Sequence, residues 1–290
     1  MSNYGIPYMG SKAKIAASIA LNFPKADHFY DLFGGGFSMT HYMVENKAKR
    51  YKHFHYNEIK ADVVDLVKSA IAGEFNYDVF KPEWISREAF FARKDTDAYV
   101  RCLWSFGNNQ KCYLFGPDIE PYKRSMHQAI VFDDFDAQAK DVLGFSKWPQ
   151  TIKSITQRRL YLRQRVAFKS KGLKRGDLEQ LQQLQQLEQL EQLERLNFYS
   201  GDYRQVPILS NSVVYCDIPY KGTADYIGAF NHKEFYDWAM SRDFPVYVSE
   251  YNIDDPRFKL VYEVDKRAML SATKSNKQMS EKLYWNGVSL

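Results

Sequence analysis

The groups best suited to chemistry in this sequence stand together at the end of one apolar run. Residues 212–216 read as a buried strand, and Asp217, Ile218, Pro219 and Tyr220 follow it directly. The carboxylate of Asp217 can accept a hydrogen bond from an amino group, Pro219 stiffens the turn, and Tyr220 offers a flat face to a planar ring. This set suits the exocyclic amine of a nucleobase that has been turned out of its helix.

A glycine-rich turn far upstream is a second place where a ligand could bind. Residues 31–38, Asp-Leu-Phe-Gly-Gly-Gly-Phe-Ser, follow one strand-like run and open a helical one, and glycines there let the backbone approach a ligand closely. The turn is not a Walker loop, because no Gly-Lys-Ser or Gly-Lys-Thr follows it. It is not a complete dinucleotide fingerprint either, because position 39 is methionine. An ordinary strand-to-helix turn is the alternative.

Two charged residues accompany this turn in the sequence. Glu58 directly follows the next strand-like run, where folds of alternating strands and helices bind ribose hydroxyls. The alternative for Glu58 is an ordinary acid at a helix start. Lys12 lies in Tyr8-Met9-Gly10-Ser11-Lys12 at another helix start, and it could hold a carboxylate by charge-assisted hydrogen bonds. A surface lysine is the default interpretation.

The elements that must position these groups alternate along the chain. Strands are expected at 28–33 and 52–57, and helices at 11–22, 37–46 and 59–72. The pattern resumes with strands at 196–199, 212–216, 246–249, 258–264 and 282–285, and with a helix at 232–241. This order predicts an α/β fold, with a parallel sheet and helices on its faces.

Residues 75–195 interrupt this pattern and read as an inserted domain. Strand signals fade there, while Trp, Tyr, Arg and Lys become frequent. Between Lys147 and Gly176 there are ten Lys or Arg and no Asp or Glu. Such a block fits a polyanionic partner, and a solvated basic helix face is the alternative.

Seven leucines recur at every third position near the end of this insert: Leu178, Leu181, Leu184, Leu187, Leu190, Leu193 and Leu196. The composition favours a helix, but a step of three turns each leucine by roughly −60° on an α-helix. The leucines should then circle the helix instead of forming a coiled-coil seam. We therefore expect a low-complexity helical spacer, with a packing or dimer helix, or DNA contact through glutamines, as alternatives.

The overall composition bounds the class of protein. The chain has 290 residues, 45% of them hydrophobic, and a net charge of +5, which fits a folded domain or two with a mild basic excess. The three cysteines give neither a disulfide framework nor a zinc pattern. We expect no signal peptide in residues 1–12 and no membrane span, because no apolar run reaches about 18 residues. A reducing cytoplasm fits these features.

Taken together, these segments resemble the Dam-type DNA adenine-N6 methyltransferases (D12 class, alpha group), over roughly 1–72 and 196–290. The resemblance implies a Rossmann-like sheet that binds S-adenosylmethionine (SAM), formed by 1–74 and 196–290. It also implies a mostly helical target-recognition insert at 75–195, in which 177–195 is a Leu/Gln/Glu-rich helix. The reaction would be methyl transfer from SAM to N6 of an adenine flipped out of double-stranded DNA, in a bacterial or phage setting, with or without a restriction partner. No metal, membrane or obligatory protein partner is implied.

The resemblance also carries residue roles onto matching positions. Catalysis would fall to Asp217, Ile218, Pro219 and Tyr220. The cofactor would be bound by Tyr8, Lys12, Asp31, Phe33, Gly34, Gly35, Gly36, Ser38, Glu58, Asp202, Tyr203 and Asp217. DNA phosphates would be held, in the basic block, by Lys147, Lys153, Arg158, Arg159, Arg163 and Arg165.

Two positions depart from the family pattern. Ile218 replaces the usual first proline of Asp-Pro-Pro-Tyr, a position that offers its backbone carbonyl to the target amine. A carbonyl survives any substitution, so activity should survive, although the loop loses one restricted φ angle. Phe37 stands where glycine is frequent, which affects how closely the backbone can approach a ligand.

Other functions share parts of this pattern. Cytosine-N4 methylases usually begin the tetrad with Ser, and RNA or protein-glutamine methylases more often with Asn, so Asp217 favours adenine. A catalytically silent DNA-binding protein of the same fold would be expected to lose Asp217, Tyr220 or the glycine turn, and none is lost. A nicotinamide-dependent dehydrogenase lacks its complete fingerprint here.

Overall fold

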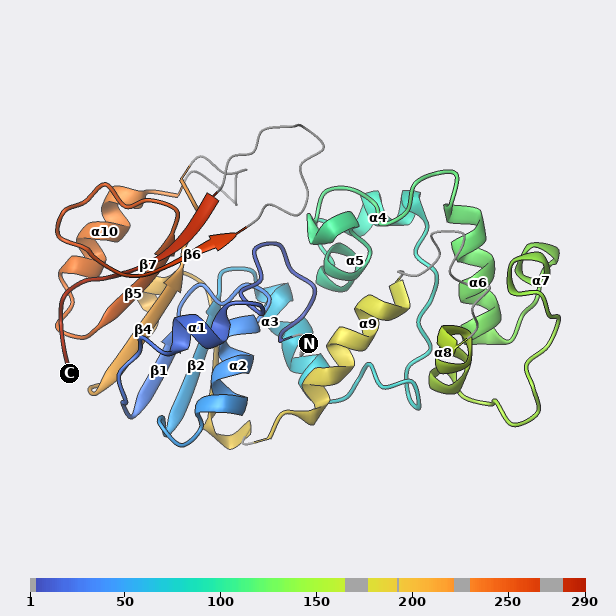
Figure 1. The fold of residues 1–290 in the computed structure, drawn as a ribbon, viewed down its shortest axis with the longest axis horizontal. Coiled ribbons are helices and arrows are strands. Elements are labelled where there is room, and N and C mark those ends of the chain that lie inside the picture. Colours follow the sequence, from blue (N-terminus) through green and yellow to red (C-terminus); the bar gives the residue numbers. More distant parts are fainter. Residues whose placement is uncertain (1–3, 165–176, 192, 222–229, 267–278) are drawn as a thin grey trace. The chain divides into compact units, whose positions relative to one another are not determined.

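The computed structural model describes residues 4–164, 177–191, 193–221, 230–266 and 279–290 (Figure 1). The chain forms two compact units, which are described separately. The sheet unit comprises Met1–Gly5, Ser11–Val64 and Leu190–Leu290, and the helical unit comprises Ile6–Gly10 and Asp65–Gln189. The expected insert spanned 75–195, so the helical unit begins and ends earlier than the sequence pattern suggested. Helix α3 (Ala61–Ile71) runs from the first unit into the second.

The sheet unit is built on a seven-stranded sheet in the order β3-β2-β1-β4-β5-β7-β6 (Figure 1). Five neighbouring strands are parallel, and β7 runs antiparallel to β5 and β6. The strands are β1 (His28–Asp31), β2 (His53–Glu58), β3 (Leu196–Ser200), β4 (Ser212–Asp217), β5 (Val246–Glu250), β6 (Lys259–Lys266) and β7 (Met279–Trp285). The predicted α/β fold with a Rossmann-like parallel sheet is confirmed.

The strand order reverses between β1 and β4, and this reversal fixes where a site can form. From β1 the chain proceeds to β2 and β3 on one side, whereas β4 and β5 extend the sheet on the other. Ligands of open α/β sheets bind beyond the carboxyl ends of the strands at such a switch point. Asp31 ends β1 and Asp217 ends β4, so the two acidic motifs of the sequence meet at this edge.

The helices of the sheet unit are α1 (Ala16–Ala20), α2 (Ser38–Lys47) and α10 (His232–Met240). The helix expected over 11–22 is therefore wrong at its start. The carbonyl of Lys12 accepts the amides of Ile15 and Ala16, and the Lys12 amide donates to Ser38 Oγ at 3.0 Å. These contacts form a turn that buries Lys12 (4% exposed), so tertiary structure overrides local helix propensity.

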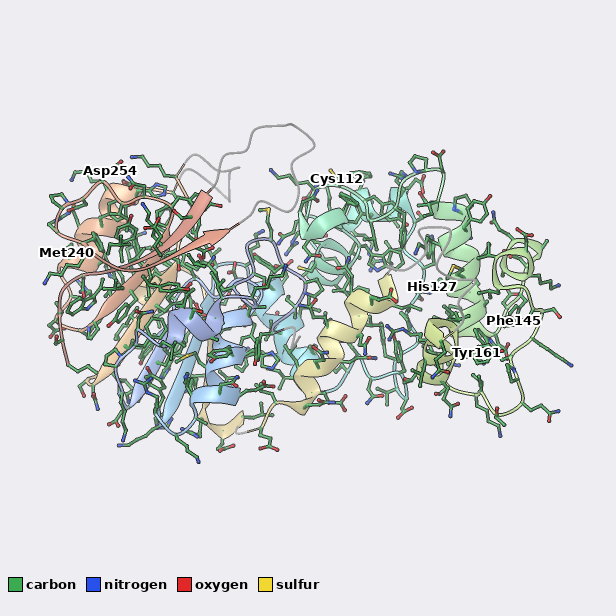
Figure 2. All side chains as sticks on the ribbon, viewed as in Figure 1. Cys112, His127, Phe145, Tyr161, Met240 and Asp254 are labelled. Atoms are coloured by element: carbon green, nitrogen blue, oxygen red, sulfur yellow. The ribbon has the colours of Figure 1, made fainter. Side chains whose placement is uncertain are left out.

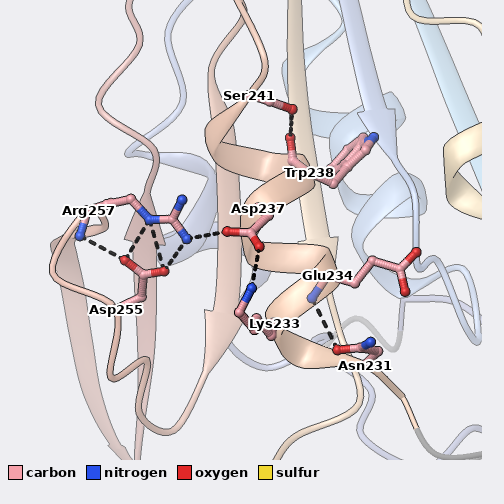
Figure 3. Close-up of polar contacts among 8 residues, drawn as sticks. All are labelled: Asn231, Lys233, Glu234, Asp237, Trp238, Ser241, Asp255 and Arg257. Atoms are coloured by element: carbon pink, nitrogen blue, oxygen red, sulfur yellow. Dashed lines mark hydrogen bonds and ion pairs between the residues drawn. The ribbon is translucent and has the colours of Figure 1, made fainter.

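Polar contacts fix helix α10 at both ends (Figure 3). The side chain of Asn231 accepts the Glu234 amide at 3.1 Å and caps the helix start. On the outer face Asp237 pairs with Lys233 at 3.0 Å and with Arg257 at 2.7 Å, and Arg257 also binds Asp255. Arg257 thus ties the helix to the segment between β5 and β6, which places His232, the first helical residue.

The described part of the helical unit is mostly helical, as expected. Its helices are α4 (Arg87–Arg93), α5 (Ala98–Leu103), α6 (Glu120–Phe132), α7 (Ala137–Leu143), α8 (Ile155–Gln164) and α9 (Asp177–Gln185). One core joins α6, α7, α8 and α9 around Trp148. Phe145 and Tyr161 meet edge to face there at 5.9 Å, and His127 of α6 donates to the Pro82 carbonyl at 2.9 Å (Figure 2).

The leucine repeat forms a buried face, which fits the alternative of a packing helix and not the expected low-complexity helical spacer. Six of the seven leucines are at most 8% exposed, and only Leu193 is 44% exposed. Helix α9 ends at Gln185, and a 3₁₀ turn over Gln186–Gln189 follows. The three leucines of α9 step by roughly −60° each and so span only about 120° of the helix surface, and the α-helix ends before further leucines could reach its opposite side. The repeat therefore packs as a core element.

Phe37, the second departure from the family pattern, adopts the left-handed conformation (φ 68°, ψ 7°) before α2. That conformation costs a non-glycine residue about 1–2 kcal/mol. The ring is fully buried, meets Tyr56 edge to face at 5.1 Å and stacks near Phe198 at 6.2 Å. Burial of the ring offsets the backbone strain, so the turn keeps a shape that usually needs glycine.

Candidate active site

Two buried charges and one partly exposed charge form the centre of the candidate site. The ammonium of Lys12 lies 2.5 Å from Asp217 Oδ2 and 3.2 Å from Glu281 Oε1. Burial lowers the pKa of Lys12, but the two carboxylates outweigh it and raise that pKa above its ordinary value. The side chains of Lys12 and Glu281 are 5% and 2% exposed, and that of Asp217 is 20% exposed. Asp217 is thus the member of this cluster that a substrate can reach most readily.

The ring of Tyr220 lies against the same cluster. Its hydroxyl donates to Glu281 Oε1 at 2.9 Å, and the Lys12 ammonium lies 5.0 Å from its ring centroid. Tyr251 meets it edge to face at 4.5 Å. Burial, followed by the charges of Asp217 and Glu281, raises the Tyr220 pKa, so its hydroxyl stays a hydrogen-bond donor. One face of a fixed aromatic ring therefore stands beside the Asp217 carboxylate.

Contacts on both sides fix the loop that carries these residues. Ile218 is 2% exposed and packs in the core cluster that includes Val214 and Phe235. His232 Nε2 donates to the Pro219 carbonyl at 2.8 Å. An isoleucine side chain anchored in the core thus takes over part of the restraint that a proline ring would impose on φ.

A buried carboxylate of β5 holds the part of this loop that directly follows Tyr220. Glu250 accepts the amide of Lys221 at 3.0 Å and the amide of Tyr251 at 2.7 Å. Its side chain is 1% exposed, and burial raises its pKa. The two amides satisfy a charge that would otherwise be costly to bury. Glu250 therefore links the loop after Tyr220 to the end of β5.

The glycine-rich turn after β1 is closely packed and polar. A Cβ atom on Gly34 would lie 2.3 Å from the Tyr56 ring, so only glycine fits there. Asp31 is buried, and Thr40 donates to its Oδ2 at 2.8 Å. Burial and the nearby charge of Asp217 raise the pKa of Asp31 to about 7. Within the described part of the chain Asp31 Oδ1 has no hydrogen-bond partner, so this turn holds a polar atom that a cationic ligand could satisfy.

Glu58, at the end of β2, touches the same turn. Its Oε2 accepts the Gly35 amide at 3.0 Å and its Oε1 accepts the Lys60 amide at 3.2 Å. Burial raises the pKa of this carboxyl. The structure thus brings together the turn and the acid that the sequence paired, at the strand end where ribose hydroxyls bind in related folds.

An aromatic wall continues the site from β1 to the segment after β3. Phe33 and Tyr203 lie 5.0 Å apart, and Tyr203 also contacts Phe235 and Trp238. Asp202 caps the short 3₁₀ helix Tyr203–Gln205 through the Arg204 amide and also accepts from Arg204 Nε at 2.9 Å. Ser38 accepts the Lys12 amide. Tyr8 is 6% exposed and belongs to the helical unit, so its role stays a prediction.

The six basic residues expected to hold DNA divide into different environments. Lys147 and Lys153 are exposed. Arg158 and Arg159 are 8% exposed. Arg158 donates to the Ile130 carbonyl at 2.9 Å and pairs with Asp133, whereas Arg159 bonds Tyr77 and Gln182. Burial with these partners argues against phosphate contacts by the two arginines. The Arg163 side chain and the whole of Arg165 lie outside the described residues.

A surface hollow in the helical unit has a volume of about 400 Å³. It is lined by Glu83, Trp84, Ser86, Ala89, Arg124, Gln128 and Phe132. Arg124 and Gln128 stand one turn apart on α6, so their side chains share one face. Both are residue types that read base edges. The sequence analysis did not single out either of them.

Sequence reasoning also missed Glu281, Glu250 and His232. The signal for Glu281 was an acid at a strand position that faces inward with Leu283, and both residues are at most 2% exposed. His232 and Glu250 become meaningful only when their backbone partners are known. No helix in the described ranges is long and apolar enough to cross a membrane, and those ranges hold no group of side chains arranged for a metal ion.

The strand order and the acids at its switch point define an α/β protein of the Rossmann-like, ligand-binding type. The family model of the D12 class N6 adenine-specific DNA methyltransferases matches residues 8–244, and the chain belongs to this family. The rRNA methyltransferase aviRa from Streptomyces viridochromogenes is a similar solved structure, with 10% identity over 98% of this chain and 88% of that chain and a TM-score of 0.38. The search of curated proteins gave no match.

Proposed function

We propose that this protein transfers a methyl group from SAM to N6 of adenine in double-stranded DNA, after the base has been flipped out, and that it acts in the cytoplasm. The observation that carries the proposal is the position of Asp217 at the end of β4. There a partly exposed carboxylate stands beside the fixed ring of Tyr220, across the switch point from the glycine-rich turn. Family membership supports the same reaction.

The residues at and after the ends of β1 and β2 suit a cofactor that carries both a positive charge and a ribose. The turn offers the buried Asp31 oxygen, Glu58 stands where a ribose hydroxyl would be bound, and Phe33 and Tyr203 could flank a planar ring. Lys12 would contribute to the cofactor pocket from its position between Asp217 and Glu281. When bound, SAM supplies an electrophilic methyl group.

The residues after β4 would prepare the amine to accept that group. The lone pair of N6 is delocalised into the adenine ring, so the amine is a poor nucleophile. Asp217 and the carbonyl of Ile218 would each accept a hydrogen bond from one N–H of the amine. These bonds increase the electron density on nitrogen and fix the direction of its lone pair. Tyr220 would stack on the extruded base. Alignment and electrostatics then supply most of the rate.

The helical unit would bind the DNA around the target. Exposed Lys147 and Lys153 are the described members of the basic block that can contact phosphates. Arg124 and Gln128 in the hollow of α6 would read base edges, because Arg suits guanine and Gln suits adenine. Replacing either by Ala should change the methylated sequence more than it changes total DNA binding, as sequencing of modified sites would reveal.

Transfer of labelled methyl from SAM to unmethylated duplex DNA tests the reaction. Digestion to nucleosides should place the label in N6-methyladenosine, and Asp217→Ala should lower the rate by at least about 100-fold. Asp243→Ala, which changes an exposed aspartate before β5, is the matched control and should leave the rate unchanged. Label in cytosine, in RNA or in protein, or full activity in Asp217→Ala, would overturn the proposal.

A further inference from the structure

Glu281 is a buried carboxylate that the proposed chemistry does not use directly. It lies on β7, opposite Val264 of β6, and is 2% exposed. An ionised carboxylate in such a place is destabilising unless charged or hydrogen-bonding partners surround it. Here its Oε1 receives both the Lys12 ammonium at 3.2 Å and the Tyr220 hydroxyl at 2.9 Å.

These two partners come from distant parts of the sequence and belong to different parts of the site. Lys12 belongs to the turn before α1, whereas Tyr220 lies in the loop after β4. Through one oxygen atom Glu281 fixes the position of the ammonium and the direction of the phenol ring. The ammonium in turn lies 5.0 Å from that ring and 2.5 Å from Asp217.

The charge balance shows what Glu281 does to Asp217. Lys12 carries one positive charge, which it divides between the carboxylates of Asp217 and Glu281. Without the Glu281 charge, the ammonium would no longer be shared with a second carboxylate and would be attracted more strongly to Asp217. It would then bind more firmly the carboxylate that must accept the adenine amine, and a buried pair of this kind is hard to separate.

We propose that Glu281 is a positioning residue for methyl transfer, acting through Tyr220 and Lys12. It orients the Tyr220 ring that receives the base, and it draws the Lys12 ammonium partly away from Asp217 so that the amine can reach that carboxylate. This inference rests on the proposed function of the site.

Steady-state kinetics on Glu281→Gln tests the inference. Glutamine keeps the size and an oxygen acceptor for Tyr220 but removes the charge. We expect kcat to fall about 10- to 100-fold, because the hydrogen bond from Tyr220 and the attraction of Lys12 both lose their charged partner, while KM for SAM changes less than about threefold. Glu263→Gln is the matched control, since Glu263 lies on the same hairpin with a side chain that is 45% exposed. Its kcat should equal that of the wild type.

A double-mutant cycle separates positioning from a merely structural role. Tyr220→Phe removes the hydroxyl and keeps the ring, and its loss of kcat should not add to that of Glu281→Ala, because both changes break the same hydrogen bond. Thermal unfolding confirms that each variant is folded. If the Glu281 variants do not fold, Tyr220→Phe decides alone, and an unchanged kcat overturns the inference.

The possible results distinguish the inference from the function on which it rests. A wild-type protein that transfers no methyl group to DNA overturns the proposed function. A wild type that is active, together with folded Glu281→Gln of unchanged kcat, overturns only the role of Glu281. Fully additive losses in the cycle overturn its action through Tyr220.

Discussion

Buried charges serve different purposes in the two units of this protein. In the sheet unit Lys12, Asp31, Asp217 and Glu281 gather at one edge of the sheet, and two of the acids belong to strand ends at the switch point. In the helical unit Arg158 bonds the Ile130 carbonyl, pairs with Asp133 and lies near the Trp148 ring, while Arg159 bonds the Tyr77 hydroxyl and Gln182. Burial of a charge therefore indicates a site only if two conditions are met. Several charges must converge, and the fold must leave room for a ligand beside them.

The largest effect expected from this contrast is that of Lys12→Met. The change leaves Asp217 and Glu281 close together without their shared cation. Breaking a buried ion pair from one side costs about 3–5 kcal/mol, which urea unfolding measures. SAM binding, followed by calorimetry, should weaken as well. Lys147→Met, at an exposed position of the helical unit, should change neither quantity, and a stable Lys12→Met variant would contradict the comparison.

Asp31 should give the stability of the sheet unit a dependence on pH. Its pKa is raised to about 7 in the folded chain, above the unfolded value near 3.8. The folded state therefore holds an extra proton between these pH values, and the associated stability is present below about pH 4 and lost as pH rises through 7. The effect should not exceed about 4 kcal/mol.

The measurement is urea unfolding of wild type and Asp31→Asn from pH 4 to pH 8. The stability difference, wild type minus variant, should fall as pH rises, since asparagine does not titrate. A difference that stays constant with pH would show that Asp31 ionises normally. Asp134→Asn, at an exposed position after α6, provides the reference for a solvated aspartate.

Arg158→Met should affect stability without affecting the site. It removes the bond to the Ile130 carbonyl, the pair with Asp133 and the contact with Trp148. We expect a loss of about 1–3 kcal/mol in unfolding free energy and an unchanged Kd for SAM. An unfolding free energy equal to that of the wild type, combined with weaker DNA binding, would indicate that Arg158 contacts DNA after all.

The smallest effect on stability is expected for Lys147→Ala and Lys153→Ala. Both side chains are exposed, so unfolding free energy should change by less than about 0.5 kcal/mol. If each lysine neutralises one phosphate, the slope of log Kd for DNA against log salt should fall by about one per variant. An unaltered slope would place the phosphate surface elsewhere in the helical unit.

The sequence predicted the parts of the site that are local in the chain. Apolar runs located the strands, and Asp217 to Tyr220 and residues 31–38 marked the strand ends that the sheet brings together. It did not predict Glu281 or Glu250, because their partners lie on distant segments and only pairing in the sheet brings them close. The roles of the predicted site residues remain to be tested by the experiments above.

Other predictions were wrong where packing outweighed local preference. The turn at Lys12 replaced helix because its amide and its ammonium both found buried partners. A basic block suggests contact with phosphates, yet Arg158 and Arg159 turn inward. The number of charges in a segment does not show which side chains point to solvent. The leucine repeat was judged against one unbroken α-helix, whereas α9 ends at Gln185 after three of the seven leucines.

The short 3₁₀ turn after α9 should respond to an inserted triplet differently from the α-helix itself. In an α-helix three added residues would rotate every following side chain by roughly 60° and turn the apolar face away from its contacts. In the 3₁₀ turn over Gln186–Gln189 they complete one full turn and advance the chain by about 6 Å. One Leu-x-x triplet added within this turn would therefore leave the direction of Leu187 unchanged, whereas the same triplet added within α9 would rotate the residues that follow it.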